Sequence, residues 1–341
     1  MRVVLYGNLG AGQLGASYER ALRQVGCDVH VVDTQERTAN LAVWLRQRVL
    51  HRLTINSLRL RALGSRLWNE KVVEAVRVKR PSFLLVLKGD FLMPATIETV
   101  KQMGVPVFIF YPDNPLPGFP SGRPETLPSA KAADAYFIWS RDVQQKLQEK
   151  GCNVHYLPFG WDADTHPYAP YSGTGSEVVF IGNWDAHRER VLERVAERFD
   201  LSIWGTDYWQ TRTSSRAVQA AWKGRPLLRR EMSEMMSASK ISLNIIREFN
   251  LPDGTNMRTF EIPGSGGFAL STYSTGVDEL LPDGDGSALF KSLDELIEKT
   301  AHFLAWPGER QQIAERGHAT VAASHQYSNR AEQIVALRRA L

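Results

Sequence analysis

The chain has 341 residues, of which 43% are hydrophobic and 23% are charged. This length corresponds to about two domains of ordinary size, and the hydrophobic content excludes a disordered chain. Two cysteines, Cys27 and Cys152, are too few for a disulfide framework, and no clustered histidines accompany them as a zinc site requires. We therefore expect a reducing compartment and no structural metal.

The first residues, MRVVLYGN, enter a strand-like run at once, which predicts that the chain has no signal peptide. No window approaches the roughly 18 uninterrupted apolar residues of a membrane-spanning helix. We expect a cytoplasmic protein that contacts a membrane at most from its surface.

Short apolar runs alternate with amphipathic stretches along the chain. Fully apolar strands separated by helices predict parallel sheets covered on both faces, and so an α/β fold. We expect strands at 3–6, 29–32, 83–87, 107–110, 136–139, 154–157, 178–181, 201–204, 241–246 and 267–271. Helices expected at 293–305, 309–323 and 328–340 have no strands between them, so they should pack outside the sheets.

The domain break is expected after the strand that ends at Leu157. Residues 158–177 are rich in Pro, Gly and Ser and have no apolar period, which is typical of a linker. The predicted division is an N-terminal domain at 1–160, a second domain at 174–325 and a C-terminal helix at 326–341.

The first loop contains a GxGxxG pattern, Gly10, Gly12 and Gly15, followed by Asp33 at the end of the next expected strand. In a dinucleotide site such glycines admit a pyrophosphate and the acid holds a ribose. Here, however, Gly7 to Leu9 lengthen the loop beyond that fingerprint. We therefore favour a flexible loop bordering an interdomain cleft over a nicotinamide cofactor site.

The segment HYLPFGWDADTHPY, residues 155–168, resembles the segment that joins the two domains of GT-B glycosyltransferases. Asp253 and Glu261, with seven residues between them, are similar to the paired acidic residues of retaining GT-B enzymes. The pattern Asn256-x-Arg258-x-Phe260-Glu261 with the following GSGGFALS more narrowly resembles the CgeB-like, or spore maturation protein-like, family. LLVLKGDFL and YPDNP in the first half agree with that family more loosely.

The resemblance implies two Rossmann-like domains facing a cleft, with acceptor on the first and nucleotide-sugar donor on the second. A helix that begins near Asn256 would direct its amides at a diphosphate, Arg258 would add a charge, and Glu261 would accept from ribose hydroxyls. The loops after the second domain's strands supply the remaining donor candidates. The full donor set is Gly182, Asn183, Arg188, Arg247, Asp253, Asn256, Arg258, Glu261, Ser274 and Thr275, and Gly10 and Gly12 form the acceptor-side loop.

The resemblance also implies metal-independent transfer with no cofactor, in glycan or cell-envelope biosynthesis, because a helix dipole and arginines stabilise the leaving diphosphate. An inverting enzyme needs a base for the acceptor proton, for which Asp113 in the Pro-rich loop at 111–128 is the first candidate and Asp90 the second. The acidic pair favours retention, in which Asp113 would only orient the acceptor. The acceptor itself, whether a glycan, a lipid-linked sugar, a protein or a small molecule, stays open.

The net charge of +4 is concentrated in one segment. Residues 37–80 hold eleven Lys or Arg and two Glu, a net of +9, so the rest of the chain carries −5. Leucines between these arginines predict basic amphipathic helices. Such helices suit an anionic membrane surface, a polyanionic acceptor, or simply the solvated face of a core-packed helix. Aromatic residues do not alternate with the basic ones, so we do not expect a nucleic-acid partner.

The sequence thus favours a glycosyltransferase. Two alternatives from other classes stay open. An NAD(P)-dependent oxidoreductase would use the GxGxxG loop, and a non-catalytic protein that binds a sugar nucleotide or polyanion would keep Arg258 and Glu261 without transfer.

Overall fold

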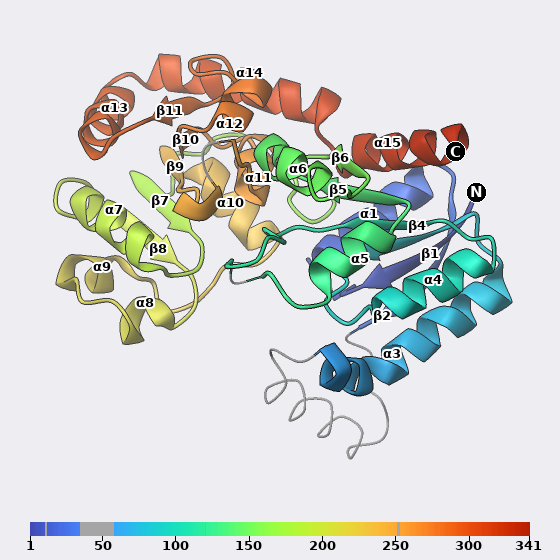
Figure 1. The fold of residues 1–341 in the computed structure, drawn as a ribbon. Helices are drawn as coiled ribbons and strands as arrows, with labels where there is room; N and C mark the ends of the chain where they lie inside the picture. The colour runs from blue at the N-terminus through green and yellow to red at the C-terminus, as the bar shows by residue number, and fades with distance from the viewer. Residues whose placement is uncertain (11, 35–57, 120, 251–252) are drawn as a thin grey trace. The chain divides into compact units, whose positions relative to one another are not determined.

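The computed structural model describes residues 1–10, 12–34, 58–119, 121–250 and 253–341. These residues form two compact units (Figure 1). Unit 1 comprises Met1–Pro158 and Ser328–Leu341, and unit 2 comprises Phe159–Tyr327. The last helix therefore belongs to unit 1, although the segment immediately before it, Phe159–Tyr327, forms unit 2.

Unit 1 is built on a six-stranded, wholly parallel sheet in the order β2-β1-β3-β4-β5-β6. Its strands are β1 (Arg2–Gly7), β2 (Asp28–Asp33), β3 (Phe83–Leu87), β4 (Val107–Phe110), β5 (Ala135–Ile138) and β6 (Val154–Tyr156). Its helices are α1 (Leu14–Gln24), α3 (Leu58–Lys79), α4 (Pro94–Gln102), α5 (Thr126–Ala132), α6 (Arg141–Gln148) and most of α15 (Tyr327–Ala340). The central strands β3 and β4 are buried along their whole length, as apolar runs between two helix layers require.

Unit 2 is built on a five-stranded parallel sheet in the order β11-β10-β9-β7-β8. Its strands are β7 (Val178–Ile181), β8 (Leu201–Trp204), β9 (Ile241–Asn244), β10 (Ala269–Thr272) and β11 (Ala288–Phe290). Its helices are α7 (Ala186–Ala196), α8 (Tyr208–Thr211), α9 (Arg216–Ala221), α10 (Arg230–Ala238), the short 3₁₀ helix η1 (Glu248–Asn250), α11 (Met257–Gly264), α12 (Thr275–Leu280), α13 (Leu293–Ala305) and α14 (Pro307–Ser324).

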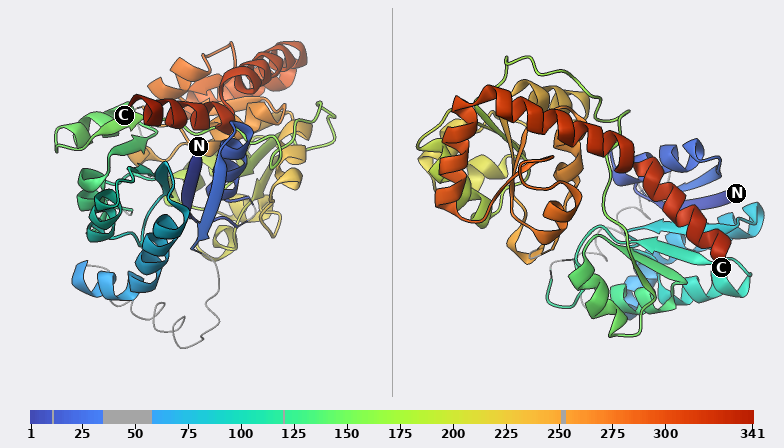
Figure 2. Two further views of the ribbon diagram at one scale, coloured as in Figure 1. Left: turned by 90° about the vertical axis from the view of Figure 1, so that its right-hand side faces the viewer. Right: turned by 90° about the horizontal axis from the view of Figure 1, so that it is seen from above.

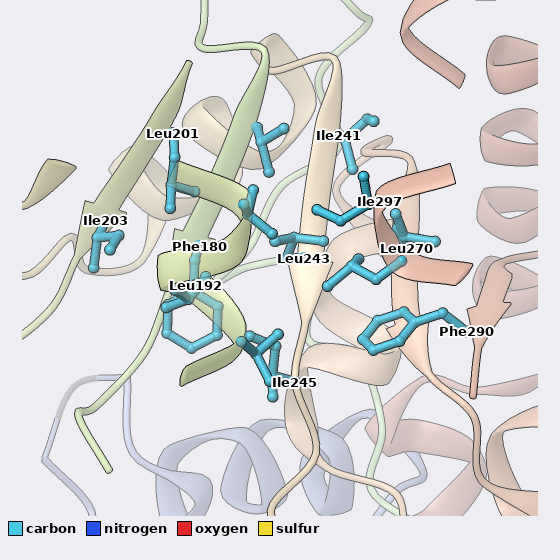
Figure 3. Close-up of a cluster of buried hydrophobic side chains, with 14 of the residues drawn as sticks. Phe180, Leu192, Leu201, Ile203, Ile241, Leu243, Ile245, Leu270, Phe290 and Ile297 are labelled. Carbon is cyan, nitrogen blue, oxygen red and sulfur yellow. The ribbon is translucent and has the colours of Figure 1, made fainter. Parts of the chain in front are cut away.

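One face of the second sheet carries a large apolar core (Figure 3). Phe180 of β7, Leu243 of β9 and Leu270 of β10 pack there against Leu192 of α7 and Ile297 of α13. Each of these side chains is buried. The periodic apolar residues of α7 and α13 therefore fix both helices on the sheet and, with them, the loops at its carboxyl edge.

All ten strands expected from the sequence are present, and β11 is an additional strand. The three C-terminal helices also form as expected, as α13, α14 and α15. Figure 2 shows α13 and α14 along the outside of unit 2 and α15 along unit 1. In unit 1, Arg338 Nε of α15 donates to the Ser82 carbonyl at 2.8 Å and Arg330 Nε to the Pro158 carbonyl at 3.1 Å.

The basic segment is described only in part. Residues 37–57 lie outside the described residues, and the chain from Leu58 to Lys79 is the helix α3. Among the helices that the structure describes, none is both long enough and apolar enough to span a bilayer. The proposed contact of this segment with a membrane surface stays a prediction.

Candidate functional site

The strand order of unit 2 reverses between β7 and β9, because β8 lies beyond β7 while β10 and β11 lie beyond β9. Ligands of open parallel sheets bind at the carboxyl ends of the strands that flank such a reversal. Most of the expected donor residues lie in the segments that follow these two strands. They are Gly182, Asn183, Arg188, Arg247, Asp253, Asn256, Arg258 and Glu261.

A partly buried polar network fixes the first turn of α11 to the end of β9. Asn256 caps the helix: its Oδ1 accepts from the Thr259 amide at 3.0 Å, and Thr259 Oγ1 accepts from the Asn256 amide at 3.3 Å. Asn256 Nδ2 also donates to Oδ1 of Asn244, the last residue of β9, at 2.8 Å. The amide end of α11, which carries the positive end of the helix dipole, is thereby held at the carboxyl edge of the sheet.

Three guanidinium groups come together at this edge. Arg258, in the first turn of α11, donates from Nε to the carbonyl of Ile181 at the end of β7, at 3.1 Å. Arg188, in the first turn of α7, donates from Nε and Nη2 to the carbonyl of Ile245, just past β9, at 3.2 and 2.9 Å. The arginine that follows β9 in the chain thus contacts the end of β7, and the arginine that follows β7 contacts the end of β9.

The third guanidinium, that of Arg247, is linked to Arg188 by a shared carboxylate. Asp185 Oδ2 lies 3.5 Å from Arg188 Nε and 3.4 Å from Arg247 Nε. Burial lowers the pKa of Arg188 to about 10; Asp185 opposes this shift, and the charges of Arg247 and Arg258 add to it. Arg188 thus lies within electrostatic reach of both other arginines, an arrangement that favours an anion as ligand.

Glu261 lies on α11, one turn beyond Arg258, and is only 2% exposed. Its Oε2 forms a close ion pair with Arg258 Nη1, and its Oε1 lies 3.4 Å from His166 Nε2. Burial alone would raise the pKa of Glu261, but the charge of Arg258 and then His166 outweigh it and lower the pKa to about 2. The carboxylate therefore stays ionised and holds Arg258 in place.

Two loops pack together beside the start of α11. Ser274 Oγ donates to the Gly254 carbonyl at 2.7 Å, and a Cβ on Gly276 would lie 2.1 Å from the carbonyl oxygen of Asp253. The structure thus brings the segments that contain Ser274 and Asp253 together. The side chain of Thr275, which follows Ser274, is exposed to solvent. Only glycine fits at position 276.

Gly182 and Asn183 act at this edge through their main chains. The Gly182 carbonyl accepts from Trp209 Nε1 at 2.8 Å, and the Asn183 carbonyl accepts from Arg188 Nη1 at 3.1 Å. The side chain of Asn183 is exposed. Both residues therefore shape the loop that leads into α7.

In unit 1, the strand order reverses between β1 and β3, and the two acidic candidates lie at that edge. Lys88 follows β3, and its Nζ lies 3.3 Å from Asp90 Oδ2 and 3.1 Å from Asp113 Oδ2. The structure therefore brings both expected catalytic carboxylates to one lysine. Both lie in unit 1, whereas the three arginines lie in unit 2.

The glycine-rich loop of unit 1 runs from the end of β1 at Gly7 to the start of α1 at Leu14, and Gly12 adopts a positive φ of 82°. The Gly10 amide donates to Asn8 Oδ1 at 3.0 Å, and the Leu9 amide donates to Asp33 Oδ1 at 3.1 Å. Asp33, the acid that a dinucleotide site would use for the ribose, here holds the loop backbone.

Three residues of these two sites were not expected from the sequence: Asn244, His166 and Lys88. Asp185 carries a local signal, because an Asp before an amphipathic run is a typical helix cap, and its side chain accepts from the Arg188 amide at 2.9 Å. His166 has no local signal, since its partner Glu261 is far away in the sequence. Lys88 lies in the LLVLKGDFL run, whose only signal is its resemblance to the family.

The comparisons with known proteins agree with this architecture. The family model described as "Glycosyl transferase-like" matches residues 188–336, which include Arg188, Arg247, Arg258 and Glu261. A search of curated proteins finds no match. The family match covers the arginine site, and most of unit 1 lies outside it.

Solved structures match the whole chain. An α,α-trehalose-phosphate synthase (UDP-forming) from Burkholderia vietnamiensis aligns at a TM-score of 0.69 with 16% identity, covering 100% of both chains. Sucrose-phosphate synthase from Thermosynechococcus elongatus aligns at 0.66 with 13% identity, covering 99% of this chain and 98% of that one. HepE from Anabaena, solved in complex with UDP, aligns at 0.66 with 13% identity, covering 100% of both chains.

The chain has the GT-B glycosyltransferase fold. The family match makes residues 188–336 similar to glycosyltransferases, and the solved structures show the fold of the whole chain. The narrower CgeB-like resemblance stays a prediction.

Proposed function

We propose that this GT-B protein transfers a sugar from a nucleotide-diphosphate sugar to a separate acceptor. The observation that carries the proposal is the convergence of Arg188, Arg247 and Arg258 at the strand reversal of unit 2, beside the amide end of α11. A diphosphate would place its oxygens against these guanidinium groups and amides. The UDP complex of the HepE structure supports a nucleotide-sugar donor for this fold.

Two of the arginines are fixed in place by hydrogen bonds to main-chain carbonyls. Arg258 and Arg188 each donate a hydrogen bond to a carbonyl at or just past the end of a strand, which fixes the guanidinium group. A guanidinium group has five N–H donors, so others remain for phosphate oxygens. Glu261 keeps Arg258 in one orientation. We propose that Glu261 also accepts from the donor ribose, and that Asp253, Ser274 and Thr275 line the site from the neighbouring loops.

In the proposed reaction the bond between the sugar's anomeric carbon and the diphosphate oxygen breaks, and a bond to an acceptor oxygen forms. The leaving diphosphate gains negative charge, which the three guanidinium groups and the helix dipole stabilise without help from a metal ion or a cofactor. The acceptor proton passes to the departing diphosphate in a retaining reaction. In an inverting reaction it passes to a carboxylate, for which Asp113 and then Asp90 are the candidates.

A ligand panel tests the proposal. Thermal unfolding of the full chain would be followed with UDP, GDP, ADP, TDP and CMP, with UDP-glucose, and with NAD(H) and NADP(H). A ligand at 100 times its Kd stabilises the folded state by about 2.7 kcal/mol, which raises the unfolding temperature measurably. Stabilisation by at least one nucleoside diphosphate, and its loss in Arg258→Ala, is expected.

Two outcomes would contradict the proposal. In the panel, stabilisation by a nicotinamide cofactor alone would point to an oxidoreductase and to the glycine-rich loop of unit 1. In a separate turnover assay, a nucleotide sugar that binds but is never cleaved in the presence of any acceptor would point to a non-catalytic binding protein.

A further inference from the structure

A chain of three ionisable side chains leads from the arginine site into the irregular segment that precedes β7. Glu261 Oε2 pairs with Arg258 Nη1, and Glu261 Oε1 lies 3.4 Å from Nε2 of His166. His166 and Glu261 are only 6% and 2% exposed, so water does not replace either contact. In such a buried network the position of each group depends on its neighbour, and a change at His166 reaches Arg258 through Glu261.

The carboxylate of Glu261 needs a second contact to hold Arg258 in one orientation. Arg258 is bound through Nε to the Ile181 carbonyl at 3.1 Å and through Nη1 to Glu261, which leaves its remaining N–H groups for a ligand. The last torsion of a glutamate side chain has a broad distribution, so a carboxylate with one partner can rotate. Among the described residues, the side chain beside the other oxygen of Glu261 is that of His166.

The main chain of His166 is held by two hydrogen bonds. Its amide donates to the Asp162 carbonyl at 2.8 Å, and its carbonyl accepts from the Trp161 indole at 2.7 Å. Because a carboxylate only accepts hydrogen bonds, the ring nitrogen that faces Glu261 must carry a proton. The other nitrogen, Nδ1, is buried and has no hydrogen-bond partner in the part of the chain that the structure describes. The contact of the His166 ring with the site is therefore made through Nε2.

A second histidine contacts the same helix at a different point. His318, on α14, lies with its Nδ1 3.0 Å from the carbonyl oxygen of Gly264, the last residue of α11. Of these two histidines, His166 is the one beside Glu261. The pair therefore allows a role in orienting Glu261 to be separated from a general role in holding α11.

We propose that His166 is a positioning residue of the donor site. It donates from Nε2 to Glu261, fixes the Glu261 carboxylate, and thereby orients Arg258 toward the donor diphosphate. This inference rests on the proposed function, since it places the diphosphate at Arg258. The contribution of His166 to binding should therefore be specific to the diphosphate, and it should disappear when the Arg258 side chain is removed.

Titration calorimetry on the full chain tests the inference. The probe is whichever of UDP, GDP, ADP and TDP stabilises the wild type most against heat, measured beside the monophosphate of the same nucleoside. His166→Gln places its side-chain amide nitrogen where Nε2 lies in histidine, whereas His166→Asn places it where Nδ1 lies, and both variants remove the ring. The matched control is His318→Gln, which removes the contact with Gly264 and leaves His166 and Glu261 in place.

We expect the wild type to bind the diphosphate at least tenfold more tightly than the monophosphate. His166→Gln and His318→Gln should keep the diphosphate affinity within twofold. His166→Asn should weaken it at least fivefold, while the monophosphate affinity stays within twofold. In an Arg258→Ala background, His166→Asn should cause no further loss, because the effects of two residues that act through one contact are not additive.

Thermal unfolding checks that each variant is folded. If His166→Asn does not fold, His166→Leu, which fills the space without a hydrogen-bond donor, replaces it with the same expectation.

Four results would overturn the inference and leave the proposed function intact. They are equal losses of diphosphate affinity in His166→Gln and His166→Asn, an unchanged affinity in His166→Asn, an equal loss in His318→Gln, and a further fivefold loss in the Arg258→Ala background. Failure of every nucleoside diphosphate to bind the wild type would overturn the proposed function itself, and this inference with it.

Discussion

The imidazole Nε2 of His166 lies 3.4 Å from Oε1 of Glu261, and both side chains are buried. Glu261 belongs to α11, whereas His166 lies in the irregular segment at the start of unit 2. The Trp161 indole donates to the His166 carbonyl at 2.7 Å, and the Trp161 ring packs against Gly264 at the end of α11. This segment therefore contacts α11 at its middle, through Glu261, and at its end, through Gly264.

Acid should remove the contribution of Glu261 to stability. Because the folded-state pKa of Glu261 is about 2 and its ordinary value is 4.5, its carboxylate stabilises the fold above pH 4.5, and this contribution is lost as the pH falls toward 2. The full contribution is on the order of 3 kcal/mol. The unfolding temperatures of the wild type and Glu261→Gln should differ most above pH 5 and converge toward pH 2.

The control for this titration is Glu231→Gln, which removes a fully exposed carboxylate that pairs with Arg225 at 3.0 Å. An exposed ion pair contributes little, so this variant should follow the wild type at every pH. If Glu261→Gln also followed the wild type, the ion pair with Arg258 would not exist in solution.

Removing the cap of α11 should affect both stability and nucleotide binding. Asn256→Ala deletes the acceptor for the Thr259 amide and the bond to Asn244, which costs about 1 kcal/mol or more. Ser292→Ala deletes the cap of α13, where Ser292 Oγ accepts from the Glu295 amide at 3.2 Å, and should cost a similar amount. Titration calorimetry with a nucleoside diphosphate should show weaker binding in Asn256→Ala alone. Equal affinities in the two variants would separate the α11 cap from the site.

The close approach at Gly276 predicts a strong response to one added carbon. Gly276→Ala places a Cβ 2.1 Å from the Asp253 carbonyl oxygen, so the loop must move. Gly308→Ala, in α14, meets nothing within 4 Å and gains helix propensity, so it should be neutral or stabilising by up to about 1 kcal/mol. Differential scanning calorimetry checks the pair. A Gly276→Ala protein as stable as Gly308→Ala would contradict the loop packing described above.

The backbone at Lys88 has a positive φ of 68°, which side chains with a Cβ adopt at a cost. Lys88→Gly should therefore be more stable than Lys88→Ala by about 1 kcal/mol, since only the alanine keeps that cost. At Lys79, the last residue of α3, the order should reverse because alanine is the better helix former. Chemical denaturation of the four variants measures both differences, and the same sign at both positions would show that Lys88 has an ordinary backbone conformation in solution.

The sequence predicted most of the fold because its signals are local. Runs such as FLLVL and VFIF are apolar throughout, and a strand buried on both faces requires that composition. The strand β11, Ala288–Phe290, was not predicted. The glycosyltransferase resemblance also depended on a local motif, Asn256 to Glu261.

The sequence predicted which residues belong to the two sites, but it did not predict which of them contact one another. Asp90 and Asp113 were alternatives for one role, and the structure places both on Lys88, because the ends of β3 and β4 meet at one edge. Likewise, His166 pairs with Glu261 only because the fold brings together two residues that are far apart in the sequence. No periodicity encodes such long-range pairs, so sequence patterns alone do not reveal them.

The most direct test of the central claim compares a nucleoside diphosphate with its monophosphate by titration calorimetry. We predict that the wild type binds the diphosphate at least tenfold more tightly, and that Arg258→Ala removes most of this preference, since a bond to a charged group contributes about 1.5–3 kcal/mol. Arg194→Ala, which removes an exposed arginine that pairs with Glu197 on the far end of α7, should keep it. An unchanged preference in Arg258→Ala would contradict the assignment of the arginine site to the donor diphosphate.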